Sequence, residues 1–331
     1  MKQIEFTFSR PDVSTAVHLV SRITDIDAPS DFLILDSGVK NIYEDSLFSC
    51  DNVIELPGGE ASKTPDILKR LWLEMGQAKL RRDSRVVVIG GGAVCDAGAF
   101  AASTWKRGVS LTLVPTTLLC MVDASLGGKT AVNIAGEKNQ AGTVYPASEI
   151  IICPEFLQTL PSEEMVNGLA EALKTAVTGD RQIVEYLLQK DYLQAVTACL
   201  AVKGRIVAAD LEETGERRLL NLGHTIGHCI EAISGFTISH GAAVAMGIPV
   251  AAEMGGNDDF AMEFREIARK LGIETVIPST ITYQRILKHL ESDKKTTAAG
   301  RIWIIPRGWE DCEQVLLDQT AERELLEKAW H

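Results

Sequence analysis

The sequence lacks the features that mark secreted and membrane proteins. Its seven cysteines are scattered and odd in number, and no two form a Cys-x-x-Cys pair, which favours a reducing compartment. No apolar run reaches the roughly 18 residues needed for a membrane span, and nothing at the N-terminus resembles a signal peptide. We therefore expect a cytosolic protein that does not bind membranes.

Positive charge is also scarce. The net charge is −12, and the acidic residues are spread along the chain rather than collected in a tail. No basic run and no alternation of basic with aromatic residues is present, which argues against a nucleic-acid-binding surface. The global sign does not exclude an anionic small-molecule substrate, because a few lysines in one pocket can override it.

The chain has no internal repeat and no low-complexity linker. With 331 residues, 46% of them hydrophobic and 24% charged, it is long enough for two globular domains with substantial cores. We expect an α/β domain over residues 1–160 and a mainly α-helical domain over residues 161–331.

Short apolar runs predict the strands of the first domain. Thr64, Pro65 and Asp66 supply a cap, an N-terminal proline and an early acid, which together predict the start of a helix. From residue 161 onward the pattern predicts helices almost throughout. The predicted strands are 32–35, 53–56, 85–89, 109–114 and 150–152, and the later predicted helices are 185–200, 201–210, 220–233, 241–255, 258–271 and 282–292.

A glycine turn follows the strand at 85–89. Gly90, Gly91 and Gly92 lead into an Ala/Gly-rich helix, and a helix N-terminus after a glycine turn suits a pyrophosphate. Cys95 stands where the usual dinucleotide fingerprint has its third glycine. A closely packed strand–helix turn without a ligand therefore remains an alternative.

A polar, glycine-rich segment follows the strand at 109–114. It contains Asp123, Lys129, Lys138 and Asn139 and lies where α/β folds bind ligands. A solvated surface loop is the alternative interpretation.

Three of the six histidines lie close together in the second half. His224 and His228 are four residues apart in a helix-compatible run, so they share one helical face. His240 follows in a second glycine-flanked patch, and neutral imidazole is a common ligand of divalent transition metals. The pattern indicates a metal site, and core histidines bonded to backbone carbonyls are the alternative. Glu171 and Lys174 also share a helical face, one that is apolar enough to be buried.

Several of these motifs together resemble the 3-dehydroquinate synthase family, collinearly from Glu60 to Lys295. The motifs are Gly90, Gly91 and Gly92 with Asp96; residues 115–119; Asp123 and Lys129 within 122–130; Glu171 and Lys174 within 168–174; Asn221, His224 and His228 within 221–228; and His240 with Gly241.

The resemblance implies a Rossmann-like N-terminal domain that binds NAD and a helical C-terminal domain that holds Zn²⁺ or Co²⁺. The family cyclises 3-deoxy-D-arabino-heptulosonate 7-phosphate to 3-dehydroquinate with loss of phosphate, using NAD⁺ catalytically, in the shikimate pathway of aromatic amino acid biosynthesis. The substrate is expected between the domains. A homodimer is also implied, in which Arg107 reaches the phosphate site of the neighbouring subunit.

Site residues follow from matching positions. The resemblance implies that Glu171, His224 and His240 are the metal ligands. The implied substrate and catalytic positions are Arg107, Asp123, Lys129, Asn139, Lys174, Lys203, Arg217, Asn221, His228 and Lys294, with His228 as the proton shuttle. The implied NAD-binding positions are Asp36, Glu60, Lys63, Gly91, Gly92, Asp96, Thr116, Thr117, Lys129, Lys138, Phe156 and Thr159.

The chain departs from the family pattern at several positions. Ala242 replaces the glutamate that usually follows the metal-binding His-Gly, so a hydrogen bond behind the metal ligands is in doubt. Thr175 and Ala176 replace Tyr-Gly, Cys95 replaces a glycine, and Leu211 replaces a glutamate. None of these changes removes a residue with a direct chemical role.

Three alternative functions remain to be weighed. A sister sugar-phosphate cyclase such as 2-deoxy-scyllo-inosose synthase would differ at the carboxylate-binding positions, where Lys203, Arg217, Asn221 and His228 keep the dehydroquinate synthase pattern. A metal-dependent polyol dehydrogenase would release NADH and would need no cation cluster. A catalytically inactive binding or regulatory protein would show no turnover.

Overall fold

The computed structural model describes residues 2–7, 14–43, 50–292 and 300–330. The chain forms two compact units. The first comprises Met1–Pro161 together with Val207–Glu212, and the second comprises Ser162–Ile206 together with Glu213–His331. The short segment Val207–Glu212 thus belongs to the first unit although it lies within the second half of the sequence.

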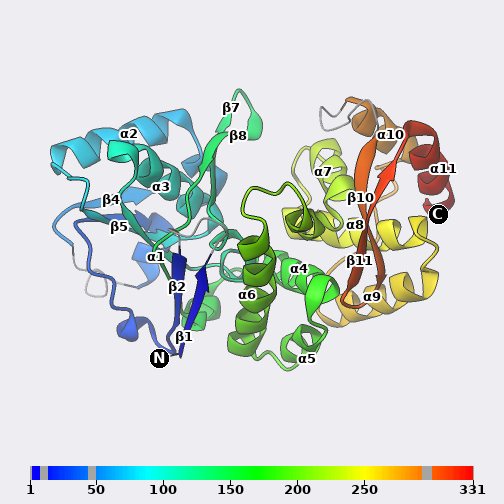
Figure 1. Ribbon diagram of the computed structural model, residues 1–331, viewed down its shortest axis with the longest axis horizontal. Coiled ribbons are helices and arrows are strands. Elements are labelled where there is room, and N and C mark those ends of the chain that lie inside the picture. The colour runs from blue at the N-terminus through cyan, green and yellow to red at the C-terminus, as the bar shows by residue number, and fades with distance from the viewer. Residues whose placement is uncertain (1, 8–13, 44–49, 293–299, 331) are drawn as a thin grey trace. The chain divides into compact units, whose positions relative to one another are not determined.

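A seven-stranded sheet is the centre of the first unit (Figure 1). Its order is β1-β2-β9-β6-β5-β3-β4; β1 is antiparallel to β2 and every other neighbouring pair is parallel. All five predicted strands are confirmed, and β1 and β2 are added to them. The strands are β1 Lys2–Thr7, β2 Ser14–Leu19, β3 Phe32–Asp36, β4 Val53–Leu56, β5 Arg85–Gly90, β6 Ser110–Pro115 and β9 Glu149–Ile152.

Helices α1 Ser37–Ile42, α2 Pro65–Gln77 and α3 Gly92–Thr104 connect these strands. The predicted start of α2 is confirmed, because the Thr64 hydroxyl accepts a hydrogen bond from the backbone N–H of Ile67 at 3.2 Å. Figure 1 shows α2 and α3 side by side, and α3 packs on β5. Short helical turns η1 Ile23–Asp25, η3 Gly59–Ser62, η4 Trp105–Arg107, η5 Cys120–Ala124 and η6 Pro154–Thr159 complete the connections. The first unit is Rossmann-like, as predicted.

The strand order reverses between β3 and β5, at the kind of position where such folds bind ligands. From β3 the chain runs outward to β4 and then returns to β5 on the other side of β3. In doubly wound sheets, ligands bind at the carboxyl ends of strands that flank such a reversal. Here those ends carry Asp36 on β3 and the turn Gly90 to Gly92 after β5.

The polar segment after β6 is largely a hairpin and not a loop. Strands β7 Lys129–Ile134 and β8 Glu137–Val144 pair antiparallel, with a register shift between Val132 and Ile134. The surface-loop alternative was therefore wrong in conformation. Most side chains of β8 are exposed, so this strand lacks the apolar alternation by which strands are recognised.

The second unit is mainly helical, as predicted, but some boundaries differ. A single helix over 192–209 replaces the predicted pair 185–200 and 201–210, because the chain breaks earlier, at Lys190, whose φ is +58°. The predicted helix 220–233 is divided at Gly223, whose φ is +76°. The helices are α4 Ser162–Gly179, α5 Gln182–Leu188, α6 Tyr192–Ala209, η7 Glu216–Asn221, α7 His224–Ile233, α8 His240–Met254, α9 Asp258–Lys270, α10 Tyr283–Ser292 and α11 Gln319–Ala329.

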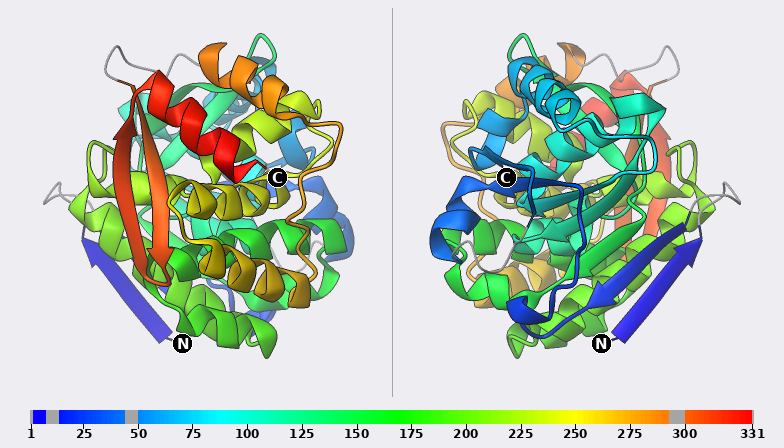
Figure 2. Two further views of the ribbon diagram at one scale, coloured as in Figure 1. Left: turned by 90° about the vertical axis from the view of Figure 1, so that its right-hand side faces the viewer. Right: turned by 90° about the vertical axis from the view of Figure 1, so that its left-hand side faces the viewer.

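The expectation of helix almost throughout the second half was wrong at its end. Strands β10 Arg301–Gly308 and β11 Asp311–Leu317 form an antiparallel hairpin beside α11 (Figure 2, left). Glu322 of α11 accepts hydrogen bonds from the side chains of Arg301 at 2.9 Å and Trp303 at 2.7 Å. These buried polar contacts fix α11 to β10.

Helix α6 is long and apolar enough to cross a membrane by length and composition alone, which the sequence analysis did not anticipate. Half of its 18-residue window is buried inside the protein. A core helix of a globular protein meets the same criterion, and the buried side chains of Ala195, Cys199 and Val202 give α6 that role here.

Candidate active site

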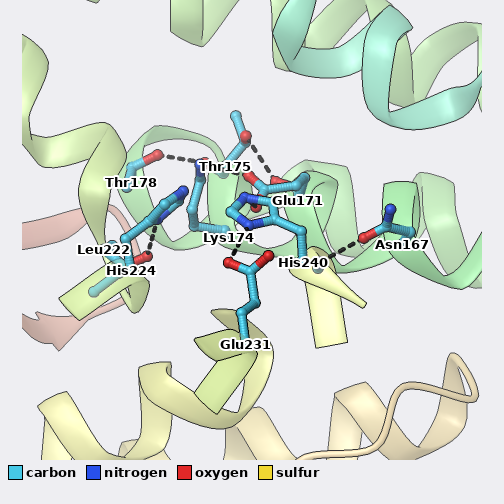
Figure 3. A network of polar contacts seen from close by, with 10 residues as sticks. Asn167, Glu171, Lys174, Thr175, Thr178, Leu222, His224, Glu231 and His240 are labelled. Carbon is cyan, nitrogen blue, oxygen red and sulfur yellow. Dashed lines mark hydrogen bonds and ion pairs between the residues drawn. The ribbon is translucent and has the colours of Figure 1, made fainter. Parts of the chain in front are cut away.

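Three helices of the second unit meet at a cluster of ionisable side chains (Figure 3). Glu171 and Lys174 come from α4, His224 begins α7, and His240 begins α8. Ligand atoms of Glu171, His224 and His240 all lie within 4.8 Å of one another. The structure thus brings together the three residues expected to be metal ligands.

Gly241 explains how α8 can approach α4 so closely. The Asn167 side chain on α4 accepts a hydrogen bond from the backbone N–H of Gly241 at 2.5 Å. A Cβ at position 241 would lie 2.3 Å from the Asn167 carbonyl oxygen, a distance that excludes any larger residue. Because Asn167 and Glu171 lie four residues apart on α4, this contact sets His240 beside Glu171.

The hydrogen bonds of the two imidazoles assign their tautomers. His224 Nδ1 lies 3.1 Å from the Leu222 carbonyl oxygen, so Nδ1 carries the proton and donates it. His240 Nδ1 lies 3.0 Å from Glu231 Oε2, and its Nε2 lies 3.4 Å from Glu171 Oε1. Each imidazole is therefore held through Nδ1, which leaves Nε2 for the centre of the cluster.

The electrostatics of the cluster are strongly coupled. Burial alone would raise the pKa of Glu171, but Lys174, 2.5 Å away, and His240 outweigh it and hold that pKa well below its ordinary value. Burial and the nearby Lys174 charge lower the pKa of His224 well below its usual range. Burial opposes a charge on His240, yet the neighbouring carboxylates of Glu171 and Glu231 raise its pKa to about 10. The cluster therefore contains a carboxylate, a neutral imidazole and an imidazole that holds an extra proton.

This donor set suits a divalent metal ion. Both carboxylate oxygens of Glu171 are buried and, among the described residues, accept no hydrogen bond of good geometry, although Lys174 and His240 lie within ion-pair distance. A buried carboxylate is stable only beside positive charge, and it can serve a metal ion as a ligand in the same way as it serves these two side chains. One carboxylate and two imidazoles, with further positions left open, is the composition of a catalytic zinc site.

The second unit also contains three buried cations from the expected substrate positions. Lys174, Lys203 and Arg217 are 1%, 6% and 3% exposed, which is rare for charged side chains and is typical of anion recognition. Asn221 donates a hydrogen bond to Glu213 at 2.5 Å, and η7, which carries Arg217 and Asn221, packs against α4.

His228 lies next to the cluster but is exposed. Its ring centroid is 5.3 Å from that of His224 and 6.0 Å from that of His240, so the expected common face of α7 is confirmed. An exposed imidazole beside this cluster is suitably placed to exchange protons with a bound molecule. Lys294 lies outside the described residues.

In the first unit, Asp36, one of the expected NAD-binding residues, lies at the carboxyl end of β3, where the strand order reverses. Asp36 Oδ1 accepts a hydrogen bond from the backbone N–H of Gly38 at 2.8 Å. A Cβ on Gly58 would lie 3.3 Å from the Asp36 carboxylate, and a Cβ on Gly90 would lie 3.1 Å from the Asp36 Cβ. Glycines thus leave space around Asp36, and the α3 N-terminus begins directly beyond, at Gly92.

Lys63 connects an expected NAD-binding residue, Asp96, with an expected substrate-binding residue, Asn139. Its Nζ donates to Asp96 Oδ2 at 2.5 Å and to Asn139 Oδ1 at 2.6 Å, and the side chain is buried. Asn133, which was not among the expected site residues, holds the hairpin in place. It donates to Glu60 Oε2 at 2.6 Å and accepts from the Asn139 backbone at 2.9 Å. The β7–β8 hairpin is therefore fastened to the loop that bears Glu60 and Lys63.

The remaining expected residues of the first unit are placed as follows. Gly91 caps α3 and packs against Thr117, and Thr116 bonds through its backbone N–H to Gly90. Phe156 is buried against Tyr43, whose hydroxyl lies 2.6 Å from that of Thr159. Asp123 is half-buried, and the exposed side chains are Arg107, Lys129 and Lys138.

The positions that depart from the family pattern lie in the interior. Thr175 donates a hydrogen bond to the Glu171 carbonyl at 2.9 Å, which holds its hydroxyl within α4. Cys95 and Leu211 are 3% exposed, Ala176 is fully buried, and Ala242 is half-buried next to His240.

Sequence reasoning missed three residues of these networks, namely Glu231, Asn167 and Glu213, and it assigned no specific role to Asn133. Asn133 lies in the polar segment already noted, and Glu231 lies one helical turn beyond His228, so a signal existed for both. Asn167 and Glu213 act through contacts that only the tertiary structure shows.

Comparisons with known proteins agree with this arrangement. The family model for the N-terminal domain of 3-dehydroquinate synthase matches residues 53–167, and the model for its C-terminal domain matches residues 168–296. A 3-dehydroquinate synthase of Pyrococcus furiosus is 40% identical over 269 residues, covering 76% of this chain and 77% of that protein. One from a Synechococcus species is 38% identical over 271 residues, covering 76% of this chain and 74% of that protein.

A solved structure shows the same fold. A crystal structure of 2-deoxy-scyllo-inosose synthase complexed with carbaglucose-6-phosphate, NAD⁺ and Co²⁺ is 22% identical and matches the whole of both chains with a TM-score of 0.87. The sequence matches, which cover both halves of the protein, decide its classification. This chain belongs to the 3-dehydroquinate synthase family.

Proposed function

We propose that this protein converts 3-deoxy-D-arabino-heptulosonate 7-phosphate to 3-dehydroquinate and phosphate, as a step of the shikimate pathway. The observation that carries the proposal is the buried Glu171 carboxylate, grouped with His224 and His240 and paired with Lys174. In this proposal, the three side chains form a metal site and Lys174 is a buried cation beside it. The family to which the chain belongs supplies the reaction.

The chain's own residues have distinct tasks in this proposal. The anionic groups of the substrate are bound by Lys174, Lys203 and Arg217. These side chains are buried, and charge-assisted hydrogen bonds are strong where water is excluded. Asp123, Lys129, Asn139, Asn221 and Lys294 are further proposed substrate contacts. His228 exchanges the protons that elimination and ring opening require.

Glu171, His224 and His240 would hold Zn²⁺ or Co²⁺, which supplies Lewis-acid polarisation of substrate oxygens when bound. NAD would accept a hydride and return it. Its ribose and pyrophosphate are assigned to Asp36 and to the turn at Gly91 and Gly92. The other proposed NAD contacts are Glu60, Lys63, Asp96, Thr116, Thr117, Lys129, Lys138, Phe156 and Thr159.

Replacing Asp36 with serine is expected to raise the Kd for NAD⁺ by about 10- to 100-fold, because a hydrogen bond to a charged acceptor is lost. Serine can still cap α1 but is too short to reach a ribose. Titration calorimetry would measure the Kd. The control is Glu55→Gln on the neighbouring strand β4, where the carboxylate pairs with Lys40. Equal Kd values for both variants would contradict the assignment.

Metal affinity is expected to rise about ten-fold per pH unit between roughly pH 7 and pH 9. Without metal, the pKa of His240 is raised to about 10, so a metal ion must displace one proton there. The lowered pKa values of Glu171 and His224 mean that neither contributes another proton. Raising the pH therefore removes the competing proton and strengthens binding. Chelator competition with Zn²⁺ measures this, and a pH-independent affinity would contradict it.

Substrate comparison distinguishes the proposed activity from the alternatives. Initial rates of phosphate release are expected to be high with the heptulosonate phosphate and negligible with D-glucose 6-phosphate, which has no carboxylate for Arg217 and Lys203 to bind. The reverse preference would identify a sister cyclase. NADH release from a simple polyol would identify a dehydrogenase, and binding without turnover would identify an inactive relative.

We further propose a cytosolic homodimer. All seven cysteines are free, which suits a reducing compartment. Arg107 is exposed on a turn where Lys106 and Arg107 both have positive φ, an uncommon backbone conformation for residues other than glycine. Its proposed role is to reach a phosphate in the neighbouring subunit. Mixing Arg107→Ala chains with chains inactivated at Glu171 tests this, since each mixed dimer would contain one site lacking both residues and one site with both.

A further inference from the structure

Glu231 is not one of the expected metal ligands, but it contacts the cluster through His240. Its carboxylate Oε2 lies 3.0 Å from His240 Nδ1, and the residue is 5% exposed (Figure 3). The other ring nitrogen, Nε2, faces Glu171 at 3.4 Å. One imidazole is thus held between two carboxylates, each on a different nitrogen.

The two carboxylates are not equivalent. Glu231 makes a hydrogen bond of ordinary length to His240, whereas the oxygens of Glu171 accept no well-formed hydrogen bond among the described residues. An imidazole that donates from Nδ1 presents its lone pair at Nε2 once it is neutral. Glu231 therefore determines which nitrogen of His240 is available to a metal.

The path of the chain supports this role. Glu231 lies in the last turns of α7, and the chain reverses through Gly235 and Phe236, both with positive φ, before His240 begins α8. His240 stands at the first position of its helix, where fewer neighbouring turns restrain a side chain than in a helix interior. A second fixed contact is needed to hold its ring.

We infer that Glu231 is a positioning residue: by accepting the Nδ1–H of His240, it fixes the tautomer and the ring orientation with which His240 faces Glu171 and His224. The inference rests on the proposed function, because the group that Glu231 orients is a proposed metal ligand. Carboxylates placed behind a metal-binding histidine raise its basicity and restrict its rotation.

A second metal site is the competing interpretation. Ligand atoms of His228, Glu231 and His240 also lie within 4.8 Å of one another. A direct hydrogen bond between Glu231 and His240 occupies the Nδ1 atom that such a site would need, and His228 is exposed. The two interpretations predict different metal stoichiometry, namely one ion per chain or two.

Titration with Co²⁺ tests the inference, because its absorption bands report coordination geometry independently of turnover. The variants are Glu231→Ala, which removes the acceptor, and Glu231→Gln, which keeps an acceptor oxygen but not the charge. The matched control is Glu253→Gln on α8, where the carboxylate pairs with Arg265 at 2.6 Å instead of with the cluster. Circular dichroism and thermal unfolding establish that each variant is folded.

The expected result is one Co²⁺ per chain in every protein. The Kd should rise about 10- to 100-fold in Glu231→Ala and less in Glu231→Gln, with altered absorption bands in the alanine variant only. The Glu253→Gln control should match the wild-type protein.

Wild-type affinity and an unchanged spectrum in folded Glu231→Ala would overturn the inference. So would a second Co²⁺ in the wild-type protein that Glu231→Ala loses. A wild-type protein that binds no Co²⁺ at all would instead contradict the proposed function, and the inference would fall with it.

Discussion

Replacement of Glu171 by glutamine is expected to lower kcat/KM by about 10³-fold and to abolish tight metal binding. Glutamine keeps the size of the side chain but removes the only carboxylate in the expected ligand set, so the charge that holds a divalent ion is lost. Metal content after dialysis and the rate of phosphate release measure the two effects.

The change at Glu171 also leaves Lys174 without its partner 2.5 Å away, so thermal unfolding of the variant must be measured as well. Glu164→Gln is the control on the same helix, because that carboxylate is exposed in the first turn of α4. A folded Glu171→Gln protein that retains stoichiometric metal and turnover would refute the assignment of the ligand.

Replacement of Lys174 by methionine is expected to act in opposite directions on metal binding and on turnover. Removing a positive charge beside the site should tighten metal binding, since Lys174 and a metal ion compete for the Glu171 carboxylate. Turnover should fall sharply, because the buried ammonium is the proposed anion contact.

Stability is expected to depend on metal in this variant. Without metal, Lys174→Met leaves the buried Glu171 with His240 as its remaining cationic neighbour, which costs up to about 3–5 kcal/mol. Bound metal replaces the missing cation, so the loss in unfolding temperature should largely disappear on metal addition. Lys270→Met, which breaks an exposed pair with Glu266, should change little in either state. If Lys174→Met lowered the unfolding temperature equally with and without metal, then Lys174 and the metal ion would not share the Glu171 carboxylate.

Much of the first unit follows from local sequence. The apolar runs at 32–35 and 85–89 predict strands buried on both faces, and both became interior strands of the sheet. Thr64 and Pro65 mark the start of a helix through capping chemistry, which acts over only a few residues. Such signals are contained in short segments and need no knowledge of the rest of the fold.

Hairpins outside the main sheet could not be predicted in the same way. Strand β8 is mostly exposed, and β11 is exposed at Glu313, Gln314 and Leu316, so neither shows a regular alternation of apolar and polar residues. Each is stabilised by antiparallel pairing with the strand that directly precedes it in the chain, which needs no regular apolar face. The helix break at Lys190 rests on a positive φ, which a lysine rarely adopts, so its residue type gave no signal for the break.

In the candidate site, too, local sequence predicts some features and only tertiary contacts determine the others. The spacing of His224 and His228 predicts a shared helical face, and their ring centroids lie 5.3 Å apart. Spacing cannot predict that His240 and Glu171 come into contact, because the two lie on separate helices that meet through the close approach at Gly241. The family resemblance supplied that grouping, and the structure supplies its geometry.

The central claim is that the protein is a redox-neutral cyclase that releases phosphate. The most direct test adds the heptulosonate phosphate to metal-loaded, NAD-saturated protein and follows inorganic phosphate and NADH absorbance together. Phosphate equal to the substrate consumed, with no net NADH and with complete loss of activity after chelation, is the predicted result. NADH that accumulates in step with substrate loss, or no phosphate release while metal and NAD are bound, would contradict the claim.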